Sequence, residues 1–201
     1  MSRKNVQKQG KLRIIGGQWR SRILPVIEQP DLRPTPDRVR ETLFNWLIAD
    51  IASSHCLDLF AGSGALGFEA ASRGAAEVVM LELQAAAYKV LQANAQTLQA
   101  DNKNNSTNIK CIQQDALQWL QSCGDKFDVV FLDPPYESDL LTESFRLLEQ
   151  SGCLAVDAKI YIEHPSQKEL PVLPENWQII RGKKAGQVGY YLATNKSQET
   201  E

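Results

Sequence analysis

The sequence predicts an α/β protein built on a doubly wound, mostly parallel sheet. From residue 55 onward, short apolar runs alternate with longer amphipathic segments, which is the pattern of strands that alternate with helices. A glycine-rich stretch, residues 61–67, directly follows the first apolar run. Because each helix returns the chain to the same end of the sheet, the strands run parallel, and ligands bind where their carboxyl ends meet.

The part of the chain before this alternation is expected to be an extension that ends in a helix. A polar tail comes first, then a β-hairpin that turns at Gly16-Gly17, then a linker rich in proline. Thr35 is a suitable N-cap for a helix that begins at Pro36. The expected bounds are 1–11 for the tail, 12–15 and 19–24 for the hairpin strands, 25–36 for the linker and 36–47 for the helix.

The remaining elements follow in order, and each is bounded by turn residues or by a change of periodicity. The expected strands are residues 56–60, 77–83, 109–113, 127–132 and 159–163, followed by a closing hairpin of residues 177–183 and 187–194. The expected helices continue from the glycine-rich stretch to residue 73, span 84–100, open at Asp115, and span 139–150. Residues 195–201 are expected to form a polar tail.

Composition excludes several classes of protein. The 201 residues are 43% hydrophobic and 23% charged, as in a soluble globular domain, and no apolar run approaches membrane-spanning length. The basic start has no apolar core of a secretory signal, so a cytoplasmic location is expected. Four widely spaced cysteines and two histidines make a metal site improbable, so no metal is expected.

Charge is distributed unevenly along the chain. Residues 1–40 hold ten Lys or Arg and three acids, for a net charge of +7, whereas the remaining residues carry a net charge of −9. A basic arm on an acidic body suggests contact with a polyanion. In the expected hairpin, Arg13, Arg20 and Arg22 interleave with Trp19, which can stack on a base or pack inward.

The glycine-rich stretch has the spacing Gly62-x-Gly64-x-x-Gly67 between a strand and a helix, which suits a nucleotide-containing cofactor. Asp58 lies in the strand before it, Glu82 ends the second strand, and Asp115 follows the third. These acids can orient a cationic amino-acid head, bind ribose hydroxyls and accept from an adenine amine, respectively. Together they favour S-adenosyl-L-methionine over a nicotinamide dinucleotide, although Asp115 can equally cap its helix.

The fourth strand ends in Asp133-Pro134-Pro135-Tyr136. Two prolines stop the strand and leave carbonyl oxygens without neighbouring N–H donors. A carboxylate and a carbonyl can accept hydrogen bonds from a planar amine, and the tyrosine ring can stack on a heterocycle. The tetrapeptide is therefore a candidate holder for the exocyclic amine of a nucleobase.

Several stretches together carry a resemblance to a known family. They are Arg13-Ile14-Ile15-Gly16-Gly17, residues 33–45 (RPTPDRVRETLFN), residues 57–64 (LDLFAGSG), Asp133-Pro134-Pro135-Tyr136 and Gly186-Gln187-Val188. Over residues 12–193 the chain resembles the RsmD-type 16S ribosomal RNA guanine-N2 methyltransferases, which are class I S-adenosylmethionine-dependent enzymes. The resemblance implies a Rossmann-like sheet of seven strands with the last strand antiparallel.

The resemblance also implies the organisation and the roles of residues. Residues 12–36 become an RNA-binding extension and 37–194 the methyltransferase domain, acting as a monomer on 16S ribosomal RNA within a small ribosomal subunit or an assembly intermediate. Asp133, Pro134 and Tyr136 become the catalytic residues. The implied cofactor-binding residues are Asp58, Phe60, Gly62, Ser63, Gly64, Glu82, Asp115, Ala116, Thr35 and Arg38. The implied substrate-binding residues are Arg13, Trp19, Arg20, Arg22, Arg40 and Tyr136.

The expected reaction is methyl transfer to the N2 amine of an unstacked guanine. Asp133 and the Pro134 carbonyl accept from the amine, orient its lone pair, and Asp133 takes the proton. Three alternatives stay open on the sequence: a DNA adenine-N6 methyltransferase, a nicotinamide-dependent dehydrogenase, and a non-catalytic RNA-binding assembly factor. Against the first of these, no insertion large enough to read a duplex is present.

Overall fold

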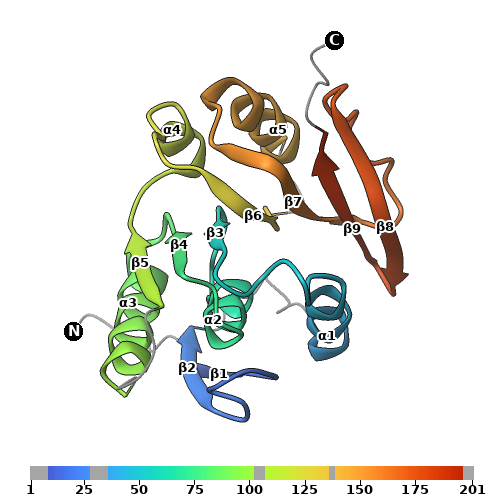
Figure 1. Ribbon diagram of the computed structural model, residues 1–201. Coiled ribbons are helices and arrows are strands. Elements are labelled where there is room, and N and C mark those ends of the chain that lie inside the picture. Colours follow the sequence, from blue (N-terminus) through green and yellow to red (C-terminus); the bar gives the residue numbers. More distant parts are fainter. Residues whose placement is uncertain (1–8, 28–35, 102–106, 136–138, 197–201) are drawn as a thin grey trace, which may run out of the picture.

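The computed structural model describes residues 9–27, 36–101, 107–135 and 139–196, which form one large sheet, one small sheet and five helices (Figure 1). The large sheet has the strand order β5-β4-β3-β6-β7-β9-β8. Its strands are β3 (His55–Asp58), β4 (Glu77–Leu81), β5 (Asn108–Ile112), β6 (Phe127–Leu132), β7 (Leu154–Pro165), β8 (Trp177–Ala185) and β9 (Val188–Asn195). The helices are α1 (Asp37–Trp46), α2 (Ala65–Ser72), α3 (Ala85–Ala100), α4 (Ala116–Leu120) and α5 (Leu140–Ser151). None of the helices in these ranges is long and apolar enough to cross a membrane.

The topology of the large sheet confirms the predicted fold. Strands β3 to β7 pair in parallel, while β9 runs antiparallel to both of its neighbours. The chain leaves β3 toward β4 and β5, then returns to place β6 on the other side of β3. The carboxyl ends of β3 and β6 therefore flank a topological switch point, where open α/β sheets bind ligands.

Both faces of the large sheet are buried, which explains the continuous apolar runs of its central strands. On β6, Val129 and Phe131 belong to one core, and Val130 and Leu132 to the other. The first core is completed by α1, α2 and α3, and the second by α4 and α5, on opposite faces of the sheet (Figure 1). Side chains on both faces of this strand are therefore buried.

The small sheet consists of β1 (Gln9–Arg13) and β2 (Ile23–Ile27), and it differs from the predicted hairpin. Residues 9–11 belong to β1 rather than to a disordered tail. Gly16-Gly17 does not turn the chain directly, because residues 14–22 form a loop that packs on α2. Ile14 and Trp19 of this loop are buried in the first core. Ile14 still pairs across the loop, because its N–H donates to the Arg22 carbonyl at 2.9 Å and its carbonyl accepts from the Ser21 N–H at 2.8 Å.

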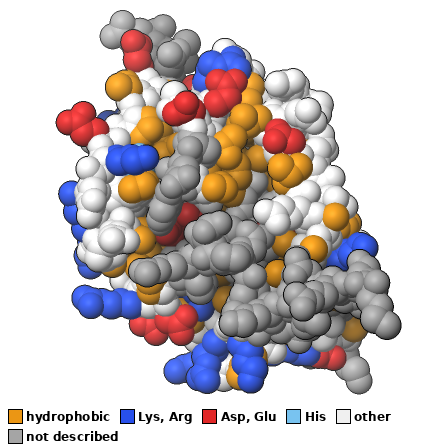
Figure 2. Space-filling view, turned by 180° about the vertical axis from the view of Figure 1, so that it is seen from behind, with side chains coloured by type: hydrophobic (Ala, Val, Ile, Leu, Met, Phe, Trp, Pro, Cys, Tyr) orange, Lys and Arg blue, Asp and Glu red, His pale blue; other side chains and the backbone are white. Residues whose placement is uncertain are grey.

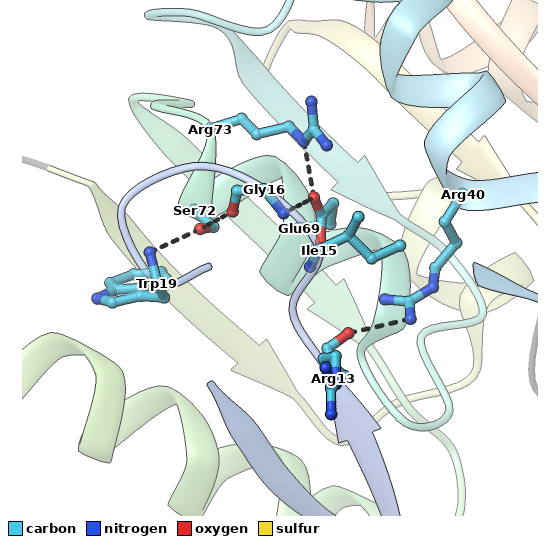
Figure 3. Close-up of polar contacts among 8 residues, drawn as sticks. All are labelled: Arg13, Ile15, Gly16, Trp19, Arg40, Glu69, Ser72 and Arg73. Atoms are coloured by element: carbon cyan, nitrogen blue, oxygen red, sulfur yellow. Dashed lines mark hydrogen bonds and ion pairs between the residues drawn. The ribbon is translucent and has the colours of Figure 1, made fainter. Parts of the chain in front are cut away.

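The loop is held by Glu69 of α2, whose side chain is fully buried (Figure 3). Its two carboxylate oxygens accept from the backbone N–H groups of Ile15 and Gly16, both at 2.8 Å, and from Nε of Arg73 at 2.7 Å. The guanidinium of Arg73 lies 5.1 Å from the centroid of the Phe44 ring in α1. One carboxylate therefore connects the hairpin loop to α2 and, through Arg73, to α1.

Ser72 adds a second connection between the loop and α2 (Figure 3). Its Oγ accepts from the Trp19 N–H at 3.0 Å and donates to the Gly16 carbonyl at 2.6 Å. Gly17 has φ +73°, and a Cβ there would lie 1.9 Å from the Ser72 carbonyl oxygen. Only glycine allows this close approach, so the pair Gly16-Gly17 serves docking rather than a tight turn.

Other element boundaries also differ from the sequence prediction. Several strand ends differ by one or two residues; β3 ends at Asp58 and β4 at Leu81, each two residues earlier than expected. The start of α1 and the extent of β7 differ as well. Helix α1 begins at Asp37, and the residue before it, Pro36, has the extended ψ of 143°, so Pro36 occupies the N-cap position that Thr35 was expected to fill. Thr35 itself lies outside the described residues. Strand β7 spans Leu154–Pro165 rather than 159–163, because it pairs along much of its length with both β6 and β9.

We expect Glu69→Gln to lower the free energy of unfolding by roughly 3 kcal/mol. Glutamine keeps the shape but removes the charge and sets an amide N–H against a backbone N–H. Urea denaturation measures the loss. Glu143→Gln is the matched control, because Glu143 also pairs with an arginine of its own helix but at the surface. A Glu69→Gln protein with a wild-type midpoint would contradict the role given to Glu69.

Candidate functional site

Acidic side chains lie at the carboxyl ends of four neighbouring strands of the large sheet. Asp58 is the last residue of β3, Glu82 follows β4, Asp115 follows β5 by three residues, and Asp133 follows β6. The strand order β5-β4-β3-β6 makes these four ends consecutive along one edge. The structure therefore brings together the four acids that the sequence singled out.

The three glycines of the predicted loop have three different environments. A Cβ on Gly67 would lie 2.4 Å from the Met80 sulfur, and one on Gly64 would lie 2.5 Å from the Phe68 ring. Both glycines are therefore required by packing within the protein. Gly62 differs, because it has φ +51° and a Cβ there would meet nothing closer than a carbonyl oxygen at 3.9 Å. The loop is thus closed on its inner side and open at Gly62, where a ligand can approach the backbone.

Asp58 supports the glycine loop from inside the first core. Its side chain is 2% exposed, and Oδ2 accepts from the Gly67 N–H at 3.1 Å. Burial raises the pKa of Asp58 to about 7, against the opposing effect of hydrogen bonds from the Gly67 and Phe60 backbone. A cationic group placed near this carboxyl would favour its charged form.

Glu82 links the glycine loop to the start of α3. Its Oε1 accepts from the Gln84 N–H at 2.7 Å. Burial raises the pKa of Glu82, while hydrogen bonds from the backbone of Gln84, Gly62 and Leu83 act in the opposite direction. The carboxylate therefore lies directly beside Gly62, at the open side of the loop.

Asp115 is the N-cap of α4, and its Oδ1 accepts from the Gln118 N–H at 2.9 Å. The capping alternative is thus correct for Oδ1, while Oδ2 is not used by this cap. Ala116, the first residue of α4, is buried, whereas Phe60 and Ser63 are half-buried beside the loop.

The predicted catalytic stretch begins where β6 ends. Asp133 is half-buried, Pro134 is buried and Pro135 is exposed. Tyr136 lies outside the described residues. Leu59, one residue beyond β3, donates its N–H to the Phe131 carbonyl at 3.3 Å, so β3 and β6 stay adjacent up to the glycine loop. Asp133 and the loop therefore lie at the two sides of the switch point.

Two residues that were expected to bind substrate are used inside the protein instead. Trp19 is 8% exposed because its ring packs in the first core, so it takes the inward alternative. Arg40 is 2% exposed, and its Nη2 donates to the Arg13 carbonyl at 3.0 Å (Figure 3). The same Nη2 also donates to Asp37 at 2.6 Å. Arg40 thus connects α1 to β1 and is not available to a substrate in this arrangement.

The other basic residues expected at the site are at the surface. The side chains of Arg13, Arg20 and Arg38 are exposed. Arg22 is half-buried and forms an ion pair with Asp101, at the end of α3. The exposed arginines of the hairpin remain candidates for contact with a polyanion.

The sequence prediction missed two buried acids. Glu69 has a signal that was present, since it is the one charged residue in the apolar run 65–71, and such a residue requires a buried partner. Glu163 ends the apolar run 160–162 of β7 and is 2% exposed. Its Oε2 accepts from the Tyr161 hydroxyl at 2.8 Å. Leu132 pairs with Ile162, so Glu163 lies beside Asp133 at the same edge.

The sheet order, the glycine loop and the acids at successive strand ends define a Rossmann-like methyltransferase. The model of the family described as "Conserved hypothetical protein 95" matches residues 12–194, and the chain belongs to this family. It is 46% identical to "Ribosomal RNA small subunit methyltransferase D" of Escherichia coli (strain K12), over 98% of this chain and 97% of that protein. The protein with that name in Haemophilus influenzae is also 46% identical, over 92% and 95% of the two chains.

A solved structure supports the same assignment. "Putative methyltransferase yhhF from Escherichia coli" superposes with a TM-score of 0.85 at 46% sequence identity, covering 94% of this chain and 100% of that chain.

We expect Asp58→Asn to gain stability relative to wild type as pH rises. The folded-state pKa of about 7 lies above the ordinary value of 3.8, so the folded protein retains a proton that the unfolded chain loses. The contribution of Asp58 to stability is complete below the ordinary value and is lost as pH rises through about 7. The asparagine variant does not lose stability in this way, because its side chain does not ionise. Urea denaturation of both proteins at about pH 5 and about pH 8 measures the difference, and a pH-independent difference would contradict the buried, raised carboxyl.

Proposed function

We propose that this protein transfers a methyl group from S-adenosylmethionine to the N2 amine of a guanine in small-subunit ribosomal RNA. The observation that carries the proposal is the position of Asp133-Pro134 at the switch point, opposite a glycine loop that is open at Gly62. Membership of the family and the names of the relatives support ribosomal RNA as the substrate. The substrate particle is expected to be a small subunit or an assembly intermediate.

The residues present fit the cofactor. Gly62 leaves space beside its backbone, and Glu82 is adjacent to that space with oxygens suited to ribose hydroxyls. Asp115 Oδ2 and the Ala116 N–H lie one strand further along the same edge and suit the amine and a ring nitrogen of adenine. When bound, the cofactor supplies an electrophilic methyl group on a sulfonium.

The protein's own task is to make a poor nucleophile reactive. The lone pair of the guanine N2 amine is delocalised into the ring, so the amine must be oriented before it can attack. The Asp133 carboxylate and the Pro134 carbonyl accept its two N–H bonds, and the two prolines fix the direction of that carbonyl. As the N–C bond forms and the S–C bond breaks, the nitrogen releases one proton to Asp133, which passes it to solvent.

We expect Asp133→Ala to lower the rate of methyl transfer to small-subunit particles by roughly a thousandfold while cofactor affinity stays close to that of wild type. Transfer is measured with a radiolabelled methyl donor, and affinity by calorimetry with S-adenosylhomocysteine. Asp128→Ala is the matched control, because Asp128 lies on the same strand at its opposite end, where it accepts from the His55 N–H. A wild-type rate in the Asp133→Ala protein would remove Asp133 from the mechanism.

The same assay tests the proposed substrate. Wild-type protein is expected to label small-subunit ribosomal RNA, and mass spectrometry of the digested RNA is expected to find N2-methylguanosine. Duplex DNA serves as the competing substrate. Labelled adenine in DNA, or cofactor binding without labelling of any RNA, would overturn the proposed function in favour of a DNA methyltransferase or a non-catalytic factor.

We expect Gly62→Ala to weaken binding of S-adenosylhomocysteine by about tenfold or more, because the new methyl group enters the space assigned to the ligand. Gly152→Ala is the matched control: Gly152 has φ +64°, close to the +51° of Gly62, and its Cβ would likewise meet nothing within 3.9 Å. Both variants carry a similar backbone strain, so both lose similar stability. Equal cofactor affinity in the two variants would show that Gly62 does not face the ligand.

A further inference from the structure

The turn between β8 and β9 lies at the same edge of the sheet as the candidate site. Glu163 near the end of β7 pairs with Tyr190 of β9, which in turn pairs with Lys183 of β8. Because β9 is antiparallel to β7, the β8–β9 turn falls beside the carboxyl end of β7. The basic side chains of β8 are thereby carried toward the edge that holds Asp133.

Strand β8 is basic in an otherwise acidic part of the chain. Residues 176–196 contain four Lys or Arg and no acid, whereas residues 41–201 as a whole carry a net charge of −9. Arg181, Lys183 and Lys184 are exposed, and within the described ranges none of them forms an ion pair. Lys and Arg side chains also occur along the margin of the molecule on which β8 lies (Figure 2).

These side chains stand on a braced support. Ser166, just after β7, donates its N–H to the Gln187 carbonyl at 2.8 Å and its hydroxyl to the Gly186 carbonyl at 3.0 Å. The Lys183 ammonium lies 6.0 Å from the centroid of the Trp46 ring. Trp46 in turn stacks on Tyr190, with ring centroids 5.4 Å apart. The charges are therefore held near fixed positions rather than on a free loop.

We propose that Arg181, Lys183 and Lys184 of β8 bind the RNA backbone beside the target nucleotide. This inference rests on the proposed function. The β1–β2 hairpin lies at the other half of the molecule, where the Asn94 side chain of α3 donates to the Pro25 carbonyl of β2 at 2.8 Å. Asp133 directly follows β6, and only β7 and β9 separate β6 from β8 in the sheet. The basic surface on β8 is therefore distinct from the hairpin and belongs to the half of the sheet that begins at β6.

Phosphate is the ligand that this surface fits. Guanidinium and ammonium groups without acidic partners bind phosphate oxygens. Charged residues on an edge strand also prevent it from pairing with the sheet of another molecule. If this were the only role of the three residues, replacing them would cause aggregation. If they bind phosphate, replacing them weakens RNA binding in a way that depends on salt.

The test is the full-length protein with Arg181, Lys183 and Lys184 all replaced by Gln. We expect the KM for small-subunit RNA to rise about tenfold or more at moderate salt, with kcat at saturating RNA and the KM for S-adenosylmethionine unchanged. The slope of log affinity for RNA against log salt concentration is expected to fall in magnitude by about 2, because each of the three lost phosphate contacts contributes roughly 0.7. The control replaces Lys110, Lys126 and Arg146 by Gln, which are exposed basic residues away from the candidate site.

A charge-preserving variant, with Arg181→Lys, Lys183→Arg and Lys184→Arg, is expected to restore RNA binding and separates charge from folding. A wild-type salt dependence and KM in the Gln variant would overturn the inference, as would aggregation with an unchanged KM in its soluble fraction. A defect seen only with particles that contain protein, and not with naked RNA, would assign the surface to a ribosomal protein instead. If the wild-type protein methylates no RNA at all, the proposed function fails first, and that result is distinct from these.

Discussion

The buried carboxylate of Glu69 is the interaction on which the arrangement of the molecule depends. It accepts from two backbone amides of the hairpin loop and from Arg73, whose guanidinium lies against Phe44 of α1. A fully buried charge is tolerated only when every oxygen is satisfied, and here the donors come from the loop and from the helix itself. The hairpin, α2 and α1 are consequently fixed to one another around a single side chain. Since α2 begins directly after the glycine loop, the same contact orients the helix that carries the candidate cofactor site.

The candidate site follows from the two-sided burial of the sheet. Because helices cover both faces, polar groups of the strands gather at the strand ends, and the carboxyl ends collect Asp58, Glu82, Asp115 and Asp133. Their environments then assign them different tasks. Asp58 is buried and supports the loop, Glu82 lies beside the open glycine, and Asp115 shares its carboxylate with a helix cap. Asp133 follows the strand on the other side of the switch point, and in the proposed mechanism this separation lets the donor and the acceptor of the methyl group meet between β3 and β6.

The sequence was informative wherever a local rule determines the structure. Alternation of apolar strands and helices predicts the parallel sheet, and the glycine spacing with its flanking acids predicts one edge of it, because both depend on residues that are close in the chain. The hairpin was placed with wrong boundaries for the opposite reason. Gly16-Gly17 has the composition of a turn, but its conformation is decided by Glu69 and Ser72, more than fifty residues away. Arg40 was assigned to substrate from the family resemblance and Trp19 from its place among the hairpin arginines, and their burial follows from tertiary contacts that no local pattern contains.

The attachment of the hairpin loop also determines how separable the N-terminal extension is. A two-stranded sheet by itself is marginally stable in water, and this one covers Ile14, Trp19 and Leu24 only by sharing the core of the large sheet. Removing it would leave the Glu69 carboxylate with Arg73 as its remaining partner and the Ser72 hydroxyl without the Trp19 and Gly16 groups that it binds. The extension is therefore not a module that evolution or an engineer can exchange freely for another recognition element. Any replacement has to present two amides and a glycine to α2 at the same places, so recognition and catalysis in this fold are expected to have diversified as one unit.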